Sequence, residues 1–144
     1  MPQQRDRITK IAYTNMKRIL LTLIMSLSFS WLFGQPSNIR RVGVDEFEEF
    51  IADTSVIILD VRTQAEHAEG FIVGTHYNID VLEDTFTKVA TETLPKDRPV
   101  ALYCRSGNRS KSAARILAEH GYQVVELETG FKGWQMAGKG IARP

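Results

Sequence analysis

Two short apolar runs, Val56–Asp60 and Val100–Cys104, limit the fold of this chain more than any other feature. Each run stays apolar up to its last residue, whereas a strand with one exposed face alternates with polar residues. Both runs are therefore typical of strands that are covered on both faces. Helical patterns lie between the runs, and strands that alternate with helices form parallel sheets. We expect an α/β fold with a central, mostly parallel β-sheet flanked by helices on both faces.

The other segments from Ile39 onward fit the same alternation. Asp45, with Glu48 three residues later, predicts a side-chain cap at the start of the first helix. Apolar spacing and stop signals predict the remaining elements. These are a helix with Val44, Phe47, Phe50 and Ile51 on one face, a weak strand over Thr75–Ile79, a helix through Phe86, Val89, Ala90 and Leu94 that Pro95 ends, a helix over Ser110–His120 before Gly121, a strand over Val124–Leu127, and a short helix through Phe131, Trp134 and Met136 that closes at Gly138.

The length of 144 residues suits one compact domain. Residues 1–35 hold five of the 18 Lys and Arg residues and one of the 17 acidic residues. This leaves 13 basic and 16 acidic residues, a net charge of −3, for residues 36–144. A slightly acidic domain without a long basic run does not favour nucleic-acid binding. Residues 1–15 are polar and unpatterned, and because Met16 is the better initiator we interpret them as a non-native or upstream extension.

Residues 16–35 have the pattern of a secretory signal peptide. Lys17 and Arg18 precede an uncharged, mostly apolar stretch from Ile19 to Phe33. That stretch is about five residues shorter than a membrane-spanning helix requires. We expect cleavage near Gln35 and an exported domain, periplasmic or secreted, that no longer contacts the membrane. An uncleaved membrane anchor is the alternative.

Cys104, the only cysteine, lies at the carboxyl end of an expected strand, and on parallel sheets ligands bind beyond those ends. The loop C-R-S-G-N-R follows before the helix at Ser110. In a strand–loop–helix turn, the N–H groups of residues 105–110 can converge on one point, and the helix dipole adds positive charge there. Gly107 gives the loop a backbone conformation that other residues avoid. We therefore expect the loop to stabilise an anion beside Cys104.

Arg105 and Arg109 add two full positive charges to this loop. Such charges lower the pKa of a thiol and favour a thiolate, a persulfide anion or a bound anion. An inert, buried cysteine would not account for two arginines and a glycine at this turn. We interpret Cys104 as a reactive thiolate, with phosphate binding without chemistry as the alternative.

The chain resembles the rhodanese homology domain in its single-domain form. The resemblance covers about residues 39–142 and rests on four segments in family order and spacing. They are I-L-D-V-R-T-Q-A-E-H-A-E-G-F-I (Ile58–Ile72), L-Y-C-R-S-G-N-R-S (Leu102–Ser110), A-A-R-I-L-A-E-H-G-Y (Ala113–Tyr122) and G-F-K-G-W-Q-M-A-G (Gly130–Gly138). One departure is that the family's double glycine before the last helix is reduced to Gly130.

The resemblance implies a sulfurtransferase whose cysteine cycles between thiolate and persulfide. It implies that Cys104 is the nucleophile, and that Asp60 and Arg62, which match the family's D-x-R, support the active-site loop. As the end of a buried strand, Asp60 is expected to accept hydrogen bonds and not to act as an acid or base. The anion pocket implied consists of Arg105, Ser106, Gly107, Asn108 and Arg109.

Sulfur would pass from thiosulfate or a persulfide donor to a thiol or cyanide, and a protein acceptor is a further option. The reaction implied requires no metal and no organic cofactor. The three histidines have no metal-ligand spacing with Cys104, which disfavours a zinc site. Two other functions stay open. One is a non-catalytic sulfur carrier or binding module. The other is a phosphatase or arsenate reductase of the same fold, which the interval from Cys104 to Arg109 disfavours because those enzymes use a loop one residue longer.

Overall fold

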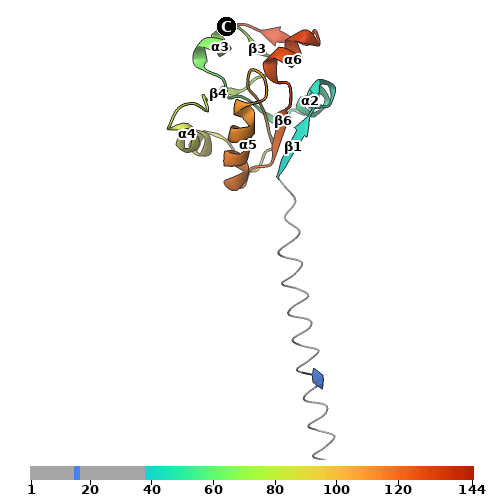
Figure 1. Ribbon diagram of the computed structural model, residues 1–144, viewed down its shortest axis with the longest axis vertical. Coiled ribbons are helices and arrows are strands. Elements are labelled where there is room, and N and C mark those ends of the chain that lie inside the picture. The colour runs from blue at the N-terminus through green and yellow to red at the C-terminus, as the bar shows by residue number, and fades with distance from the viewer. Residues whose placement is uncertain (1–14, 17–37) are drawn as a thin grey trace, which may run out of the picture. The chain divides into compact units, whose positions relative to one another are not determined.

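A five-stranded parallel sheet with strand order β1-β6-β5-β2-β4 lies at the centre of the domain. The computed structural model describes residues 15–16 and 38–144, and residues 38–144 lie in one compact unit. The parallel sheet of an α/β fold is thus confirmed. Figure 1 shows the helices packed around the sheet. The strands of the sheet are β1 (Ile39–Val42), β2 (Ile57–Asp60), β4 (Tyr77–Asn78), β5 (Val100–Tyr103) and β6 (Val124–Leu127).

Helices cover both faces of the sheet, as the sequence predicts. Helices α4 (Phe86–Thr93) and α5 (Arg109–Glu119) bury their apolar side chains in one core layer. Helices α2 (Val44–Ile51) and α6 (Gly130–Met136) bury theirs in a second layer on the other face. Strand residues alternate between the layers, so most positions of a fully buried strand are apolar.

The buried strands β2 and β5 follow the two apolar runs closely, and Phe131 and Trp134 of α6 lie in the core. The predicted cap of α2 is wrong. Gly43 precedes that helix, and no side chain caps it. A reciprocal capping box forms instead at α3 (Gln64–Glu69), where Thr63 and Glu66 satisfy each other's backbone N–H groups.

Four short strands differ from the sequence-based prediction. Strand β1 was not expected, because its middle residues Arg40 and Arg41 are polar at the edge of the sheet. The strand expected over residues 75–79 is reduced to β4. Strands β3 (Phe71–Ile72) and β7 (Ile141–Ala142) pair antiparallel and form a separate two-stranded sheet near the C-terminus.

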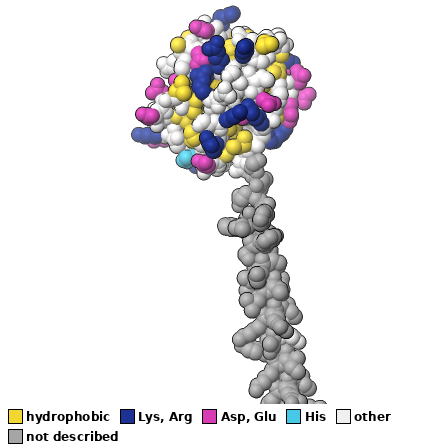
Figure 2. All heavy atoms as spheres, in the orientation of Figure 1, with side chains coloured by type: hydrophobic (Ala, Val, Ile, Leu, Met, Phe, Trp, Pro, Cys, Tyr) yellow, Lys and Arg dark blue, Asp and Glu magenta, His cyan; other side chains and the backbone are white. Residues whose placement is uncertain are grey.

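The surface of the domain carries charges of both signs. In Figure 2, basic and acidic side chains are interspersed over the visible face.

The predicted signal peptide and the upstream extension lie almost entirely outside the described residues. Among the residues that are described, no helix is long and apolar enough to cross a membrane.

Candidate active site

Cys104 directly follows β5, at the carboxyl end of a central strand. It is a free cysteine with 1% of its surface exposed. The loop after it leads into α5, which begins at Arg109, one residue before the expected start. Strand β5 fixes the position of the sulfur, and the first turn of α5 lies beside it.

Hydrogen bonds from the loop hold the sulfur of Cys104. The N–H of Gly107 donates to Sγ at 3.1 Å, and the Oγ of Ser110 lies 3.4 Å from Sγ. Burial raises the pKa of the Cys104 thiol. Hydrogen bonds with the hydroxyl and N–H of Ser110 and with the N–H groups of Ser106 and Gly107 outweigh burial, so that this pKa lies below its usual value. The site therefore stabilises negative charge on sulfur.

Two glycines allow the loop to pack tightly. Gly107 has φ +91°, and a Cβ there would lie 1.9 Å from the carbonyl oxygen of Glu128. Gly130 has φ +60°, and a Cβ there would lie 2.7 Å from the carbonyl oxygen of Cys104. The next residue, Phe131, donates its N–H to that same carbonyl at 2.8 Å. The predicted conformational role of Gly107 is confirmed, and Gly130, the first residue of α6, has no room for a side chain beside the loop.

The two arginines of the loop occupy different environments. Arg105 has an exposed side chain, whereas Arg109 is half-buried and forms an ion pair with Glu66 from α3. The Arg109 hydrogen bonds hold the pKa of Glu66 at about 2, well below its ordinary value. The positive charge of Arg109 also interacts with Cys104. Arg109 thus braces the loop as well as bringing charge to it.

A buried carboxylate lies behind Ser110. Glu126 in β6 is 2% exposed and accepts a hydrogen bond from Ser110 Oγ at 2.7 Å. Its other oxygen lies 3.4 Å from Nε of Arg41 in β1. Sequence analysis did not single out Glu126 or Arg41. The available signal was a lone acidic residue within the otherwise apolar strand V-V-E-L.

Asp60 and Arg62 form a buried network beside β5. Asp60 is fully buried and accepts hydrogen bonds from Arg62, from Tyr103 and, at 2.9 Å, from Nδ1 of His67. Arg62 also donates to the carbonyl of Gly70 and lies over the ring of Phe131. The network holds Tyr103, the residue before Cys104.

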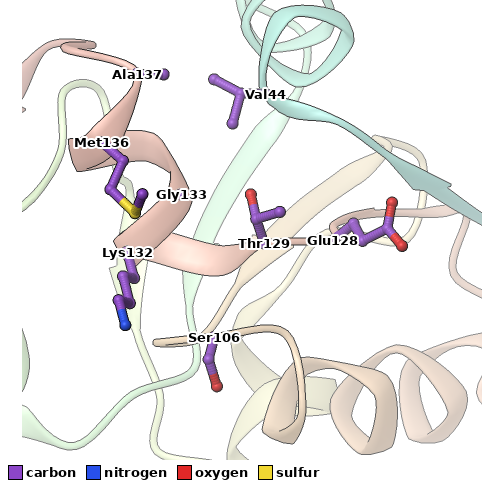
Figure 3. A pocket seen from close by; sticks show the side chains of 8 residues that line it. All are labelled: Val44, Ser106, Glu128, Thr129, Lys132, Gly133, Met136 and Ala137. Carbon is purple, nitrogen blue, oxygen red and sulfur yellow. The ribbon is translucent and has the colours of Figure 1, made fainter.

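A hollow of about 580 Å³ lies next to the loop, between α2 and α6. Figure 3 shows Lys132 and Met136 on α6, Val44 at the start of α2, and Ser106 from the loop at its edge. Within residues 15–16 and 38–144, no three His, Cys, Asp or Glu side chains group in a way that could hold a metal ion. The Asn108 side chain is exposed.

Known proteins that resemble this chain in sequence or structure are rhodanese-like proteins and sulfurtransferases. The model of the rhodanese-like domain family matches residues 43–137. A sulfurtransferase of Allochromatium vinosum is 33% identical over 74% of this chain and 97% of its own length. The thiosulfate sulfurtransferase GlpE of Pseudomonas fluorescens is 31% identical over 69% of this chain and 87% of its own length. The crystal structure of a rhodanese-related protein of Thermoplasma volcanium has a TM-score of 0.64 and 28% identity, and the match covers 73% of this chain and 99% of that one.

Proposed function

This chain belongs to the rhodanese-like family, and from that premise we propose that it transfers sulfane sulfur through a persulfide on Cys104. The observation that carries the proposal is the set of hydrogen bonds around the Cys104 sulfur. The N–H of Gly107 and the hydroxyl of Ser110 reach Sγ, and they lower the pKa of a thiol that burial alone would raise. A thiolate at neutral pH is the nucleophile that such transfer requires.

In the first half of the proposed reaction, the Cys104 thiolate attacks the outer sulfur of thiosulfate. A bond forms between Sγ and that sulfur, the S–S bond of thiosulfate breaks, and sulfite leaves with the electron pair. The product is a Cys104 persulfide anion. The loop N–H groups that interact with Sγ, from Ser106, Gly107 and Ser110, stabilise this anion in the same way as the thiolate.

In the second half, a thiophilic acceptor takes the outer sulfur and Cys104 returns to the thiolate. Cyanide would leave as thiocyanate, and a thiol would leave as a persulfide. The Gly107 N–H, which lies 3.1 Å from Sγ, then stabilises the departing thiolate. Two displacements on one sulfur atom give ping-pong kinetics. The hollow beside Ser106, with Lys132 in its lining, is the surface on which we place the acceptor.

Intact mass spectrometry tests the proposal. Incubation with thiosulfate should add one sulfur atom, about 32 Da, to the protein, and cyanide or dithiothreitol should remove it. The Cys104→Ser variant, which cannot hold a transferable sulfur at neutral pH, is the control and should neither gain mass nor turn over. A free, alkylatable Cys104 that gains no mass would overturn the proposal.

Steady-state turnover separates the two remaining alternatives. A sulfur carrier without catalytic turnover would gain the sulfur atom once and release it too slowly to sustain thiocyanate formation. A phosphatase would hydrolyse a phosphate ester such as p-nitrophenyl phosphate without gaining mass from thiosulfate. Thiocyanate formation through many cycles, with no ester hydrolysis, is the expected result.

We also propose that the domain acts outside the cytoplasm, after cleavage near Gln35. The support is the basic pair Lys17-Arg18 before the apolar stretch Ile19–Phe33. Fractionation of cells that express the full chain, followed by N-terminal sequencing, tests this. A protein that retains the apolar stretch and sediments with membranes would instead identify an anchor.

A further inference from the structure

Glu126 is a charged residue in a position that normally holds an apolar one. It lies in β6 between Val125 and Leu127, and all three side chains are buried. In the sheet, Glu126 is paired with Leu102 of β5 and Arg41 of β1. A buried carboxylate is costly unless hydrogen bonds and charges compensate it. The groups around Glu126, which lies behind Cys104, therefore have to compensate its burial.

A continuous chain of hydrogen bonds links Glu126 to the sulfur of Cys104. The thiol donates to Oγ of Ser110 across 3.4 Å, and the Ser110 hydroxyl donates to Oε1 of Glu126 across 2.7 Å. Ser110 is fully buried, with no exposed surface. Because a serine hydroxyl has one proton, a Ser110 that donates to Glu126 presents a lone pair to the thiol. In this arrangement Ser110 accepts the thiol proton, and Glu126 accepts the proton of Ser110.

We propose that Glu126 is a positioning residue that takes up the proton of Cys104 through Ser110. The S–H bond breaks and its proton passes to Oγ of Ser110, while the original hydroxyl proton passes to Oε1 of Glu126. The products are a thiolate, a Ser110 hydroxyl that now donates to sulfur, and a neutral Glu126. The proposal rests on the proposed function, since it supplies the thiolate which that reaction uses.

The charged groups around the chain are compatible with this transfer. On the β1 side, Arg41 lies 3.4 Å from Oε2 of Glu126 and leaves Oε1 to Ser110. Arg41 also donates to the carbonyls of Gly107 and Glu128, so its guanidinium is shared. On the α5 side, the charge of Arg109 interacts with Cys104, and Arg109 is paired with Glu66.

The transfer leaves the net charge of the buried cluster unchanged. A single negative charge moves from the carboxylate to the sulfur, so that no second charge has to be buried. On the β5 side the group that neighbours Glu126 across the sheet is the apolar Leu102, and α2 covers the opposite face of β6. In the proposed transfer, Cys104 and Glu126 hold one proton between them.

Shared protons have a specific signature in a pH titration. When two coupled acids hold one proton between them, the fraction of thiolate reaches a plateau and rises again only when the second proton leaves. The ultraviolet absorbance of the Cys104 thiolate should therefore increase in two steps with pH. The rate of alkylation by the neutral reagent iodoacetamide should follow the same two steps.

Three variants make the test specific. Glu126→Gln removes the proton acceptor, and Ser110→Ala interrupts the chain by a different change; each should reduce the titration to a single step. Glu128→Gln removes an exposed carboxylate two residues further along and should retain both steps. A single step in the unmodified protein, or two steps in Glu126→Gln, would overturn the proposal.

The titration tests the role of Glu126 separately from sulfur transfer. Thiolate absorbance is measured without a sulfur donor, whereas the proposed function depends on the mass gained from thiosulfate. A two-step titration without a sulfur adduct would retain the role of Glu126 and reject the sulfurtransferase. A sulfur adduct with a one-step titration would do the reverse.

Discussion

The guanidinium of Arg109 is held by the carboxylate of Glu66 through two hydrogen bonds of 2.8 and 2.7 Å. Glu66 belongs to the capping box that begins α3, and Arg109 begins α5 after the Cys104 loop. The pair therefore ties the loop to a helix that follows the neighbouring strand β2. A planar, two-point contact of this kind fixes orientation as well as charge.

Replacement of Arg109 by alanine should reduce thiosulfate turnover more than replacement of Arg105. Arg109 both braces the loop and acts on the Cys104 charge, whereas the Arg105 side chain is exposed. Loss of a partly desolvated charge near the reacting sulfur corresponds to about 1–3 kcal/mol, or about tenfold to a hundredfold in kcat/KM. Steady-state assays with thiosulfate and cyanide would measure both variants.

Iodoacetamide provides the control for that comparison. It needs the thiolate but no anion pocket, so alkylation of Cys104 should fall less than thiosulfate turnover. Two alanine variants with parental turnover would contradict the prediction. An equal fall in alkylation would mean that the arginines only set the pKa of the thiol.

The Glu66–Arg109 pair should also make stability depend on pH. Hydrogen bonds from Arg109 lower the pKa of Glu66 from 4.5 to about 2 in the folded protein. A lowered pKa contributes stability that is fully present above pH 4.5 and is lost as the pH falls toward 2. Because the pair is partly exposed, we expect Glu66→Gln to lower the free energy of unfolding at neutral pH by about 1–3 kcal/mol.

Urea denaturation at several pH values would measure this effect. The difference between the parent and Glu66→Gln should shrink as the pH falls below 4.5. Glu69→Gln, an exposed change on the same helix, is the matched control and should track the parent. A constant difference between pH 7 and pH 3 would indicate that the lost stability does not come from ionisation of Glu66.

Much of the fold could be predicted because a segment that is buried has mostly apolar residues, which are visible in its own sequence. Strands β2 and β5 are covered on both faces, and their sequences are apolar except for Asp60 at the end of β2. Strand β1 lies at the edge of the sheet and has two arginines in its centre, and so it has no such signature. Strands β3 and β7 have two residues each, too few for any periodic pattern.

The candidate site was predicted only in part, for a related reason. The loop around Cys104 could be inferred because its residues are neighbours in sequence. The residues that bind this loop are distant in sequence. Glu66 is 43 residues from Arg109, and Glu126 is 16 residues from Ser110. Such pairs depend on which strands the crossover helices bring together. Glu126, a lone acidic residue within the apolar strand V-V-E-L, was the one local signal of such a pair, and the sequence-based prediction did not use it.

Asp60→Asn should destabilise the domain strongly. Asp60 is fully buried, and its carboxylate faces Arg62, which is 3% exposed. Removal of one member of a buried pair leaves the other charge uncompensated and costs about 3–5 kcal/mol. Denaturation monitored by circular dichroism would measure the loss, with the exposed Asp97→Asn as control. If both variants unfolded at the same urea concentration, the Asp60 network would not be a source of stability.

Gly107→Ala should damage the site while it leaves the rest of the domain folded. At φ +91°, an added Cβ would lie 1.9 Å from the carbonyl oxygen of Glu128. That carbonyl belongs to the turn after β6, so the loop has to move and the Gly107 N–H leaves Sγ. The pKa of the Cys104 thiol, which this hydrogen bond helps to lower, should then rise. Alkylation would need a higher pH, and the sulfur adduct should be lost.

Gly121→Ala separates this effect from backbone strain. Gly121 has a similar φ of +86°, but a Cβ there meets nothing within 4 Å. Both variants therefore pay the same cost of placing alanine in this conformation, about 1–2 kcal/mol, and only Gly107→Ala displaces the loop. The thiol of Gly121→Ala should titrate like that of the parent. If the Gly107→Ala thiol did the same, the loop N–H groups would not be the source of the lowered pKa. The stabilisation of sulfur anions would then have to come from the Ser110 hydroxyl and Arg109 instead.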